Sequence, residues 1–290
     1  GRPRIRDLDR IPPPYRARHL FQRDWYIEGE AGVLPGSLLT SRGCPGRCLF
    51  CSRQVTGRTH RVHSPGRVVE EMRAHIELEG MGGFSFHDDA FTADSERLYD
   101  LCDRFLISFS PIPSWWCESR VDHMDVSKAE RMKTAGCCLV VFGIESGDAD
   151  MLQQIGKQVD RETIETAFTA CRQAGLPAQA NMMFGFPGET AAHLENSLRF
   201  MERLAPMVSH FSSLGIPIPF PGTQLYERYA RKYQFVDWWI DPERIDILRR
   251  PIPAGGFSEV DYHSWPALAR QMEMALLEAD FFHYSDEVKE

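Results

Sequence analysis

The stretch Ser41-Arg42-Gly43-Cys44-Pro45-Gly46-Arg47-Cys48-Leu49-Phe50-Cys51 places three cysteines within eight residues, directly after a short apolar run at 36–40. That run predicts a strand, and in a parallel barrel the carboxyl ends of the strands form the face where active sites are built. Thiolates are soft ligands that suit an iron–sulfur cluster or zinc. Three thiolates on a four-iron cluster leave one iron open. A structural zinc site needs a fourth ligand, for which His60 and His63 are the nearest candidates.

The composition is that of an ordinary globular protein: 290 residues, 43% hydrophobic and 26% charged, with a formal charge of −8. An acidic chain is poorly suited to non-specific nucleic-acid binding, which needs basic surface. The apolar runs are too short for a membrane span. Three of the eight cysteines are clustered and five are scattered, which is not the dense framework of a small secreted protein. We therefore expect a reducing, cytoplasmic setting with five buried thiols outside the cysteine motif.

Apolar runs and helical segments alternate strictly from residue 36 onward. This order predicts an α/β fold, a parallel sheet with helices outside it. Six units of this length favour a partial, TIM-like (β/α)6 barrel over the full eight-unit form. The expected strands are 36–40, 83–87, 114–121, 138–144, 178–184 and 210–218, and the expected helices are 65–78, 94–107, 127–135, 161–174 and 190–204.

Two further regions flank the expected barrel at 36–219. Residues 1–35 are expected to form a linker or strap, with Ile11–Tyr15 extended because of its prolines. Residues 220–290 are expected to form a C-terminal extension, in which a helix at 265–282 caps one barrel end. The role of this extension is not readable from its residue types.

Polar residues recur where the expected strands end. Buried polar groups at strand ends are costly unless they are paired or bind a ligand. They therefore indicate a lined cavity, although a structural ion pair between Glu118 and Arg120 is an alternative. A carboxylate such as Glu145 suits a pair of ribose hydroxyls, and glycines such as Gly185 let the backbone approach a flat base. The candidate residues are Asp88, Asp89, Glu118, Arg120, Glu145, Asn181 and Gly185.

Taken together, six motifs resemble the branch of the radical S-adenosylmethionine (SAM) superfamily that usually carries an N-terminal cobalamin-binding domain. They lie at 41–45, 88–92, 118–122, 142–147, 185–190 and 219–223. The resemblance implies that Cys44, Cys48 and Cys51 hold a [4Fe–4S] cluster whose open iron binds SAM. A flavodoxin- or ferredoxin-type protein would then supply an electron, and a 5′-deoxyadenosyl radical would act on a small-molecule substrate.

The resemblance also assigns roles around the cluster. Phe50 matches an aromatic residue that packs near the adenine, although core packing alone would explain it. The strand end at His87, Asp88 and Asp89 matches the contact with the SAM amino group, and the choice among the three stays open. Substrate-side candidates are His87, Trp116 and the Trp238-Trp239 pair.

One departure from this branch concerns cobalamin. The branch often has an Asp-x-His-x-x-Gly loop for cobalt, whereas Asp261-Tyr262-His263 lacks the glycine. The sequence begins at what resembles the linker after the cobalamin domain, so we expect that this domain was removed or is not used. Cobalamin-dependent C- or P-methylation is therefore one alternative, with cobalamin open as a further cofactor, and a non-catalytic metal-binding scaffold is the other.

Overall fold

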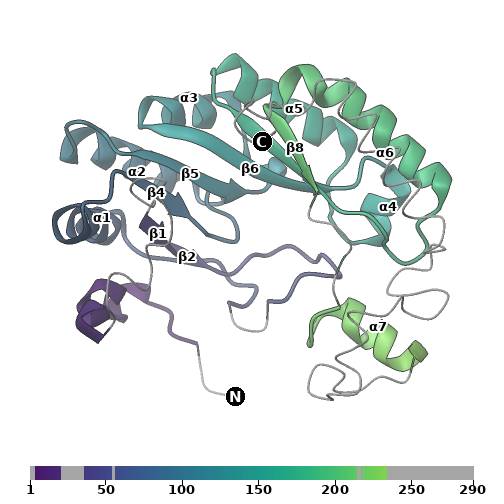
Figure 1. Cartoon of the computed structure of the whole chain (residues 1–290), viewed down its shortest axis with the longest axis horizontal. Coiled ribbons are helices and arrows are strands. Elements are labelled where there is room, and N and C mark those ends of the chain that lie inside the picture. Colours follow the sequence, from purple (N-terminus) through teal and green to yellow (C-terminus); the bar gives the residue numbers. More distant parts are fainter. Residues whose placement is uncertain (1–3, 21–35, 54–55, 214–216, 218, 234–290) are drawn as a thin grey trace, which may run out of the picture. The chain divides into compact units, whose positions relative to one another are not determined.

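The computed structural model describes residues 4–20, 36–53, 56–213, 217 and 219–233. Six strands form one sheet in chain order: β1 (Gly36–Leu38), β4 (Gly83–Phe86), β5 (Ser114–Ser119), β6 (Cys137–Glu145), β7 (Ala178–Met182) and β8 (His210–Ser213). The pairings β1–β4, β4–β5, β5–β6 and β7–β8 are all parallel. The α/β class predicted from the sequence is confirmed, and the strand order is that of a six-unit partial barrel (Figure 1).

The chain divides into two compact units. The first contains residues up to 45, 56–142 and 169–178, and the second contains 46–55, 143–168 and the residues from 179 onward. Each unit is described separately below.

Three helices lie beside the strands of the first unit: α1 (Pro65–Glu79), α2 (Ser95–Ser108) and α3 (Val126–Thr134). Each begins at a capping residue whose side-chain oxygen accepts a hydrogen bond from a backbone N–H of the first turn. The capping residues are Ser64, Asp94 and Asp125. Helix α1 packs on α2, and α2 on α3, an order that can be followed in Figure 1. A short 3-10 turn, η4 (Val121–His123), follows β5.

The core of the first unit is aromatic. The Phe86 ring stacks on Phe91 at a centroid distance of 4.9 Å and meets Trp115 edge-on at 5.4 Å. Phe105 of α2 stacks on Phe86 at 6.1 Å. These side chains are fully buried, so β4, β5 and α2 share one apolar contact region.

Two short elements of the first unit differ from the prediction. β2 (Ser41–Arg42) and β3 (Arg61–Val62) pair as a two-stranded antiparallel ladder. This pairing brings together the two ends of residues 43–60, which are called the cysteine loop below. The Ile11–Tyr15 segment is not wholly extended, because the 3-10 helix η2 (Pro14–Leu20) begins within it; another 3-10 helix, η1 (Leu8–Arg10), precedes it. Proline suits the first position of a helical turn, since its φ is already helical and its missing N–H needs no partner.

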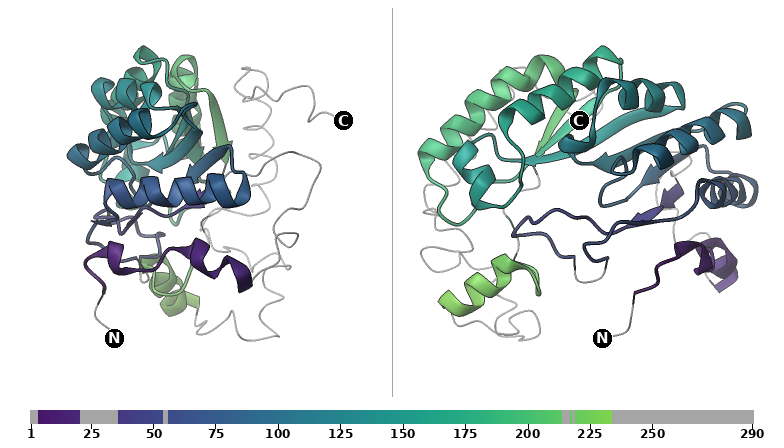
Figure 2. Two further views of the ribbon diagram at one scale, coloured as in Figure 1. Left: turned by 90° about the vertical axis from the view of Figure 1, so that its left-hand side faces the viewer. Right: turned by 180° about the vertical axis from the view of Figure 1, so that it is seen from behind.

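The second unit contains α4 (Ala149–Gln154), α6 (Ala191–Leu204), the 3-10 turn η5 (Ala205–Met207) and α7 (Gln224–Tyr233), together with most of β7 and all of β8. Helix α5 (Arg161–Gln173) begins in it. These elements are seen from two further sides in Figure 2. Helices α4 and α7 were not predicted. The predicted helix at 265–282 lies outside the described residues.

One of the five thiols that we expected to be buried is exposed. Cys102, Cys117, Cys137 and Cys171 are buried, whereas Cys138 faces solvent. The register of β5 against β6 shifts here, because Trp115 pairs with Cys137 and Trp116 pairs with Leu139. Cys138 is therefore the extra residue of a β-bulge and leaves the in–out alternation of the strand.

None of the helices in the described part of the chain is both long enough and apolar enough to cross a bilayer.

Removing the Phe105 ring tests the importance of the aromatic core. Phe105→Ala should lower the free energy of unfolding by about 3–5 kcal/mol, because it removes buried surface and leaves a cavity between α2 and the sheet. Chemical denaturation followed by circular dichroism measures this loss. Ile107→Ala, on the same helix but 86% exposed, is the control and should change stability little. Equal losses in the two variants would contradict the assigned packing.

Candidate functional site

The cysteine loop begins in a turn that only glycine adopts easily. Gly43 has φ +99°, and a Cβ there would lie 2.3 Å from the Thr59 carbonyl oxygen. The Cys44 N–H donates to the Gly57 carbonyl at 3.2 Å. The two ends of the loop thus approach each other closely, and this fixes the direction in which the chain reaches Cys44.

Asp88 holds the backbone just before this turn. It lies after β4, is fully buried, and accepts hydrogen bonds from the backbone N–H groups of Thr40 (2.6 Å) and Ser41 (2.9 Å) and from the Thr40 hydroxyl. Arg97 donates to the Thr40 carbonyl and hydroxyl oxygens at 3.1 and 2.8 Å. Burial raises the pKa of Asp88, although these donors and Arg97 oppose the shift. These contacts within the protein are enough to explain why a carboxylate is buried at position 88, without a bound cofactor.

The neighbouring Asp89 is exposed and touches the loop with one oxygen. Its Oδ2 accepts the Gly43 N–H at 2.9 Å. Asp89 is thus better placed than Asp88 for the predicted contact with an ammonium group, which stays a prediction.

Exposed and half-buried groups gather at the carboxyl ends of β4 and β5. The rings of His87 and Trp116 meet edge-on at 5.1 Å. Desolvation raises the pKa of Glu118, the nearby His87 opposes this, and Asp89 adds to it. Arg120, which the structural alternative pairs with Glu118, is buried and donates to both carboxylate oxygens of Asp122, each at 2.8 Å.

In the second unit, a tight turn and an apolar cluster position Cys48, Phe50 and Cys51. The Cys51 N–H donates to the Cys48 carbonyl at 3.3 Å. Leu49 and Phe50 pack on a buried cluster of Met151, Ile155, Met183 and Phe186. The Phe50 ring lies 5.5 Å from that of Phe186, next to the predicted base-binding Gly185. The apolar cluster therefore covers part of the Phe50 side chain. The predicted contact of Phe50 with adenine stays a prediction.

Glu145 ends β6 in a strained conformation. Its φ is +66°, a region that a residue with a side chain rarely adopts and that costs about 1–3 kcal/mol. Its Oε1 accepts a hydrogen bond from Lys157 Nζ at 3.0 Å, and both side chains are 7% exposed. Its Oε2 is buried without a hydrogen-bond partner among the described residues. A buried carboxylate with one fixed oxygen and one open oxygen is suited to accept a ligand hydroxyl.

Lys157 was missed from the sequence, where nothing distinguishes it from a surface lysine. Gly143, two residues before Glu145, is the indirect sign that a bulky group lies against the strand. A Cβ on Gly143 would lie 2.2 Å from Glu145 Oε1 and 3.2 Å from Lys157 Nζ, so the ion pair lies directly against the bare backbone.

A second buried carboxylate shapes the turn after β7. Glu189 is 3% exposed, and its Oε2 accepts the N–H groups of Gly185 and Phe186. Burial raises its pKa to about 7. On β7 itself, the Gln179 amide donates to the Asn181 oxygen at 2.6 Å, and both side chains are half-buried. Asn181 is thus oriented by its neighbour two residues away.

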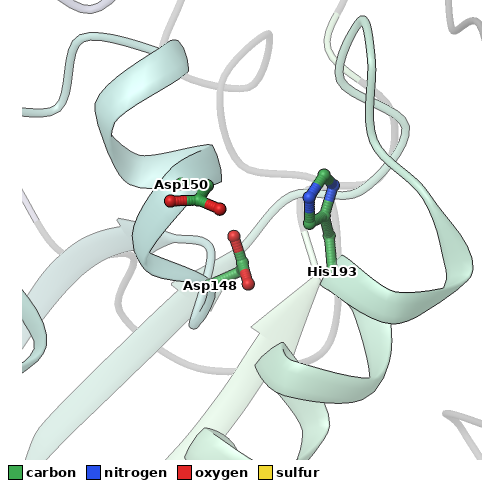
Figure 3. A group of neighbouring side chains, drawn as sticks. All are labelled: Asp148, Asp150 and His193. Carbon is green, nitrogen blue, oxygen red and sulfur yellow. The ribbon is translucent and has the colours of Figure 1, made fainter.

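Asp148, Asp150 and His193 face one another where α4 and α6 begin (Figure 3). Their ligand atoms lie within 4.8 Å of one another, a geometry that suits a cation. Two of the three side chains, however, already accept hydrogen bonds from the protein. Asp148 accepts from the Met151 N–H and the Asn196 amide, and His193 Nδ1 accepts the Thr190 N–H. We interpret the group as paired helix caps, since an Nδ1 that accepts leaves Nε2 as a donor.

With this geometry described, comparison with known proteins identifies the family. Residues 38–201 match the model of the radical SAM superfamily, and the chain belongs to that superfamily. The chain is 36% identical over 249 residues to an uncharacterised methyltransferase of Pyrococcus horikoshii, covering 81% of this chain and 52% of that protein. It is 25% identical over 256 residues to the anaerobic magnesium-protoporphyrin IX monomethyl ester cyclase of Rubrivivax gelatinosus, covering 84% and 44%. The chain thus spans about half the length of these curated relatives.

Solved structures show the same fold. The radical SAM methyltransferase TsrM of Kitasatospora setae, with cobalamin and a [4Fe–4S] cluster bound, superposes with a TM-score of 0.60 at 21% identity, over 68% of this chain and 39% of that one. The cobalamin-dependent SAM radical enzyme OxsB, with aqua-cobalamin and SAM bound, gives 0.55 at 19% identity, over 88% and 37%.

The raised pKa of Glu189 predicts a pH effect on stability. An ordinary glutamate titrates near 4.5, so between that pH and about 7 the folded state binds more protons than the unfolded state, and stability falls as the pH rises. Glu189→Gln removes this titration. The stability of the variant relative to the wild type should therefore increase from about pH 5 to about pH 8, by roughly 1–3 kcal/mol.

Urea denaturation at the two pH values measures this difference. Glu195→Gln, which removes one negative charge from an exposed position of α6, is the control. The free energies of unfolding of Glu189→Gln and the wild type could instead differ by the same amount at both pH values. That result would show that this carboxyl is ionised in the folded protein throughout the range.

Proposed function

We propose that this chain is the catalytic core of a radical SAM enzyme that modifies a small-molecule substrate. Cys44, Cys48 and Cys51 hold a [4Fe–4S] cluster in this proposal. The observation that carries it is the cysteine loop at the carboxyl end of β1, in a chain whose family match includes all three cysteines. When bound, a reduced cluster of this kind supplies the electron that cleaves SAM into methionine and a 5′-deoxyadenosyl radical.

The donor set fits the cluster. All three cysteines are free of disulfides, and three thiolates leave one iron for SAM. Burial raises the pKa of Cys102 and of Cys171 to about 12, so those thiols stay protonated and are poor ligands. His63, a candidate for the fourth ligand of a zinc site, is held at 3.1 Å by Asp9. The fit of three thiolates to a four-iron cluster with one open iron is the ground for proposing an iron–sulfur cluster.

The protein groups around the cluster would bind and orient SAM. In this proposal the open Oε2 of Glu145 accepts a ribose hydroxyl, while the hydrogen bond from Lys157 to Oε1 fixes the orientation of the carboxylate. The Gly185-Phe186 turn, held by Glu189, presents backbone and an aromatic ring to the adenine beside Phe50. Asp89 takes the ammonium group. Glu118 and Arg120 of the first unit and Asn181 of the second stay predicted SAM-binding residues in this proposal.

Methyl transfer is the second candidate reaction, because several relatives bear the name methyltransferase. Cobalamin would serve such a reaction, but this sequence has no Asp-x-His-x-x-Gly loop to ligate cobalt, so no step is assigned to it. A redox protein of the flavodoxin or ferredoxin type is the proposed electron donor, and the cytoplasm is the proposed location. Binding of added cobalamin, with methyl transfer that depends on it, would favour this second reaction.

Cys48→Ala tests the proposed function directly. After anaerobic reconstitution with iron and sulfide, the wild type should show the broad visible absorbance of an iron–sulfur cluster and should release 5′-deoxyadenosine from SAM under reduction. Cys48→Ala should lose the product and most of the absorbance, because one of three thiolate ligands is gone. Absorbance spectra and chromatography measure the two outcomes.

Cys138→Ala, which removes an exposed thiol outside the motif, is the matched control and should retain both properties. Formation of 5′-deoxyadenosine by Cys48→Ala would contradict the proposal. So would a wild type that contains one zinc ion per chain and no sulfide. The second result would instead favour a metal-binding scaffold.

A further inference from the structure

The turn that follows α4 touches both the cysteine loop and Glu145. The Ile155 carbonyl accepts the Leu49 N–H at 2.9 Å. Gly156 lies so close to the loop that a Cβ would be 2.9 Å from the Arg47 carbonyl oxygen and 3.9 Å from the Cys48 Cα. The next residue, Lys157, donates to Glu145. Three consecutive residues therefore contact the backbone around Cys48 and the strained carboxylate at the end of β6.

This turn is firmly held. Gly156 has φ +68°, and the N–H groups of Gly156 and Lys157 donate to the Gln153 and Leu152 carbonyls, which ends α4 in a left-handed cap. Ile155 is 1% exposed in the apolar cluster beneath Leu49 and Phe50. A helix end fixed in this way moves little, so it can set the position of a loop that lies against it.

The other side of Leu49 is also bonded. Its carbonyl accepts the Leu225 N–H at 3.0 Å, from the first turn of α7. Leu225 is fully buried, and Thr223 caps this turn by accepting the Tyr226 N–H at 3.0 Å. Both backbone groups of Leu49, the residue after Cys48, are thus paired with separate elements of the second unit.

We infer that the Ile155-Gly156-Lys157 turn is a positioning element that places Cys48 and the Glu145 carboxylate together, and that it requires glycine at 156. The inference rests on the proposed function, because it takes Cys48 as a cluster ligand and Glu145 as a SAM contact. A side chain at 156 would push the Arg47 carbonyl away or displace the turn. Either movement breaks the Leu49–Ile155 hydrogen bond and shifts Lys157.

Two glycine substitutions separate this effect from simple backbone strain. Gly156→Ala and Gly175→Ala both place a Cβ at a left-handed residue, with φ of +68° and +64°, but a Cβ at Gly175 meets no atom within 4 Å. Hydrogen exchange of the Leu49 amide in the metal-free protein, followed by mass spectrometry of the peptide that contains it, reports the contact without any need for activity. We expect exchange on the order of tenfold faster in Gly156→Ala than in Gly175→Ala, because the Leu49 amide opens locally.

Iron and sulfide retained per chain after reconstitution give the second measurement, and we expect Gly156→Ala to retain less than Gly175→Ala. Gly156→Asn keeps the Cβ while easing the left-handed conformation, so it should reproduce the loss even if Gly156→Ala folds poorly. Lys157→Met should leave Leu49 exchange and cluster content near the wild-type values yet weaken SAM binding. Lys157→Arg, which keeps the charge, should restore part of that binding.

Equal Leu49 exchange and equal iron content in the Gly156 and Gly175 variants would overturn the inference, even in a fully active enzyme. A wild type that binds no four-iron cluster would instead defeat the proposed function, while the exchange comparison would still report on the contact between the turn and the loop.

Discussion

The backbone of the cysteine loop has to be held by neighbouring groups, and this requirement organises the elements around it. Near Cys44, carboxylates hold the chain, since Asp88 binds the N–H groups of Thr40 and Ser41, and Asp89 binds that of Gly43. At Leu49, a helix-end carbonyl and a helix-start N–H do so. In the proposed function three of the loop's side chains bind the cluster, so hydrogen bonds to the backbone contribute much to fixing its shape, since buried backbone groups need partners.

Strain and unsatisfied polarity are concentrated at the end of β6. Glu145 combines a positive φ, a buried ion pair and an oxygen with no hydrogen-bond partner in the described part of the chain. Each of these lowers stability, and they persist where the surroundings leave no alternative. Gly143, Lys157 and the β6 backbone supply that constraint. Strain and unpaired polar atoms of this kind concentrate at functional sites, which is why Glu145 is proposed as a SAM contact.

The sequence predicted strands and long helices more reliably than it predicted which side chains contact one another. Strands and long helices were found because apolar runs and helical segments alternate regularly along the sequence from residue 36. Helix α4 was missed because six residues are too few for a periodic pattern, and the β2–β3 ladder because its pairing depends on the closing of the loop. Asp88 was expected near the cofactor, but its contacts with Thr40 and Ser41 come from segments 48 and 47 positions away. Sequence spacing cannot show such contacts, nor the burial of Lys157.

The bond between Leu225 and Leu49 has an evolutionary consequence. Segments after the last strand of an α/β core are free to diverge when they serve only to recognise different substrates. Here the first turn of that segment also supplies a backbone donor to the residue beside Cys48. Because a main-chain amide makes this bond, residues 224–233 can change most side chains during specialisation while their distance from the core stays fixed. An insertion just before Thr223 is therefore expected to disturb this bond.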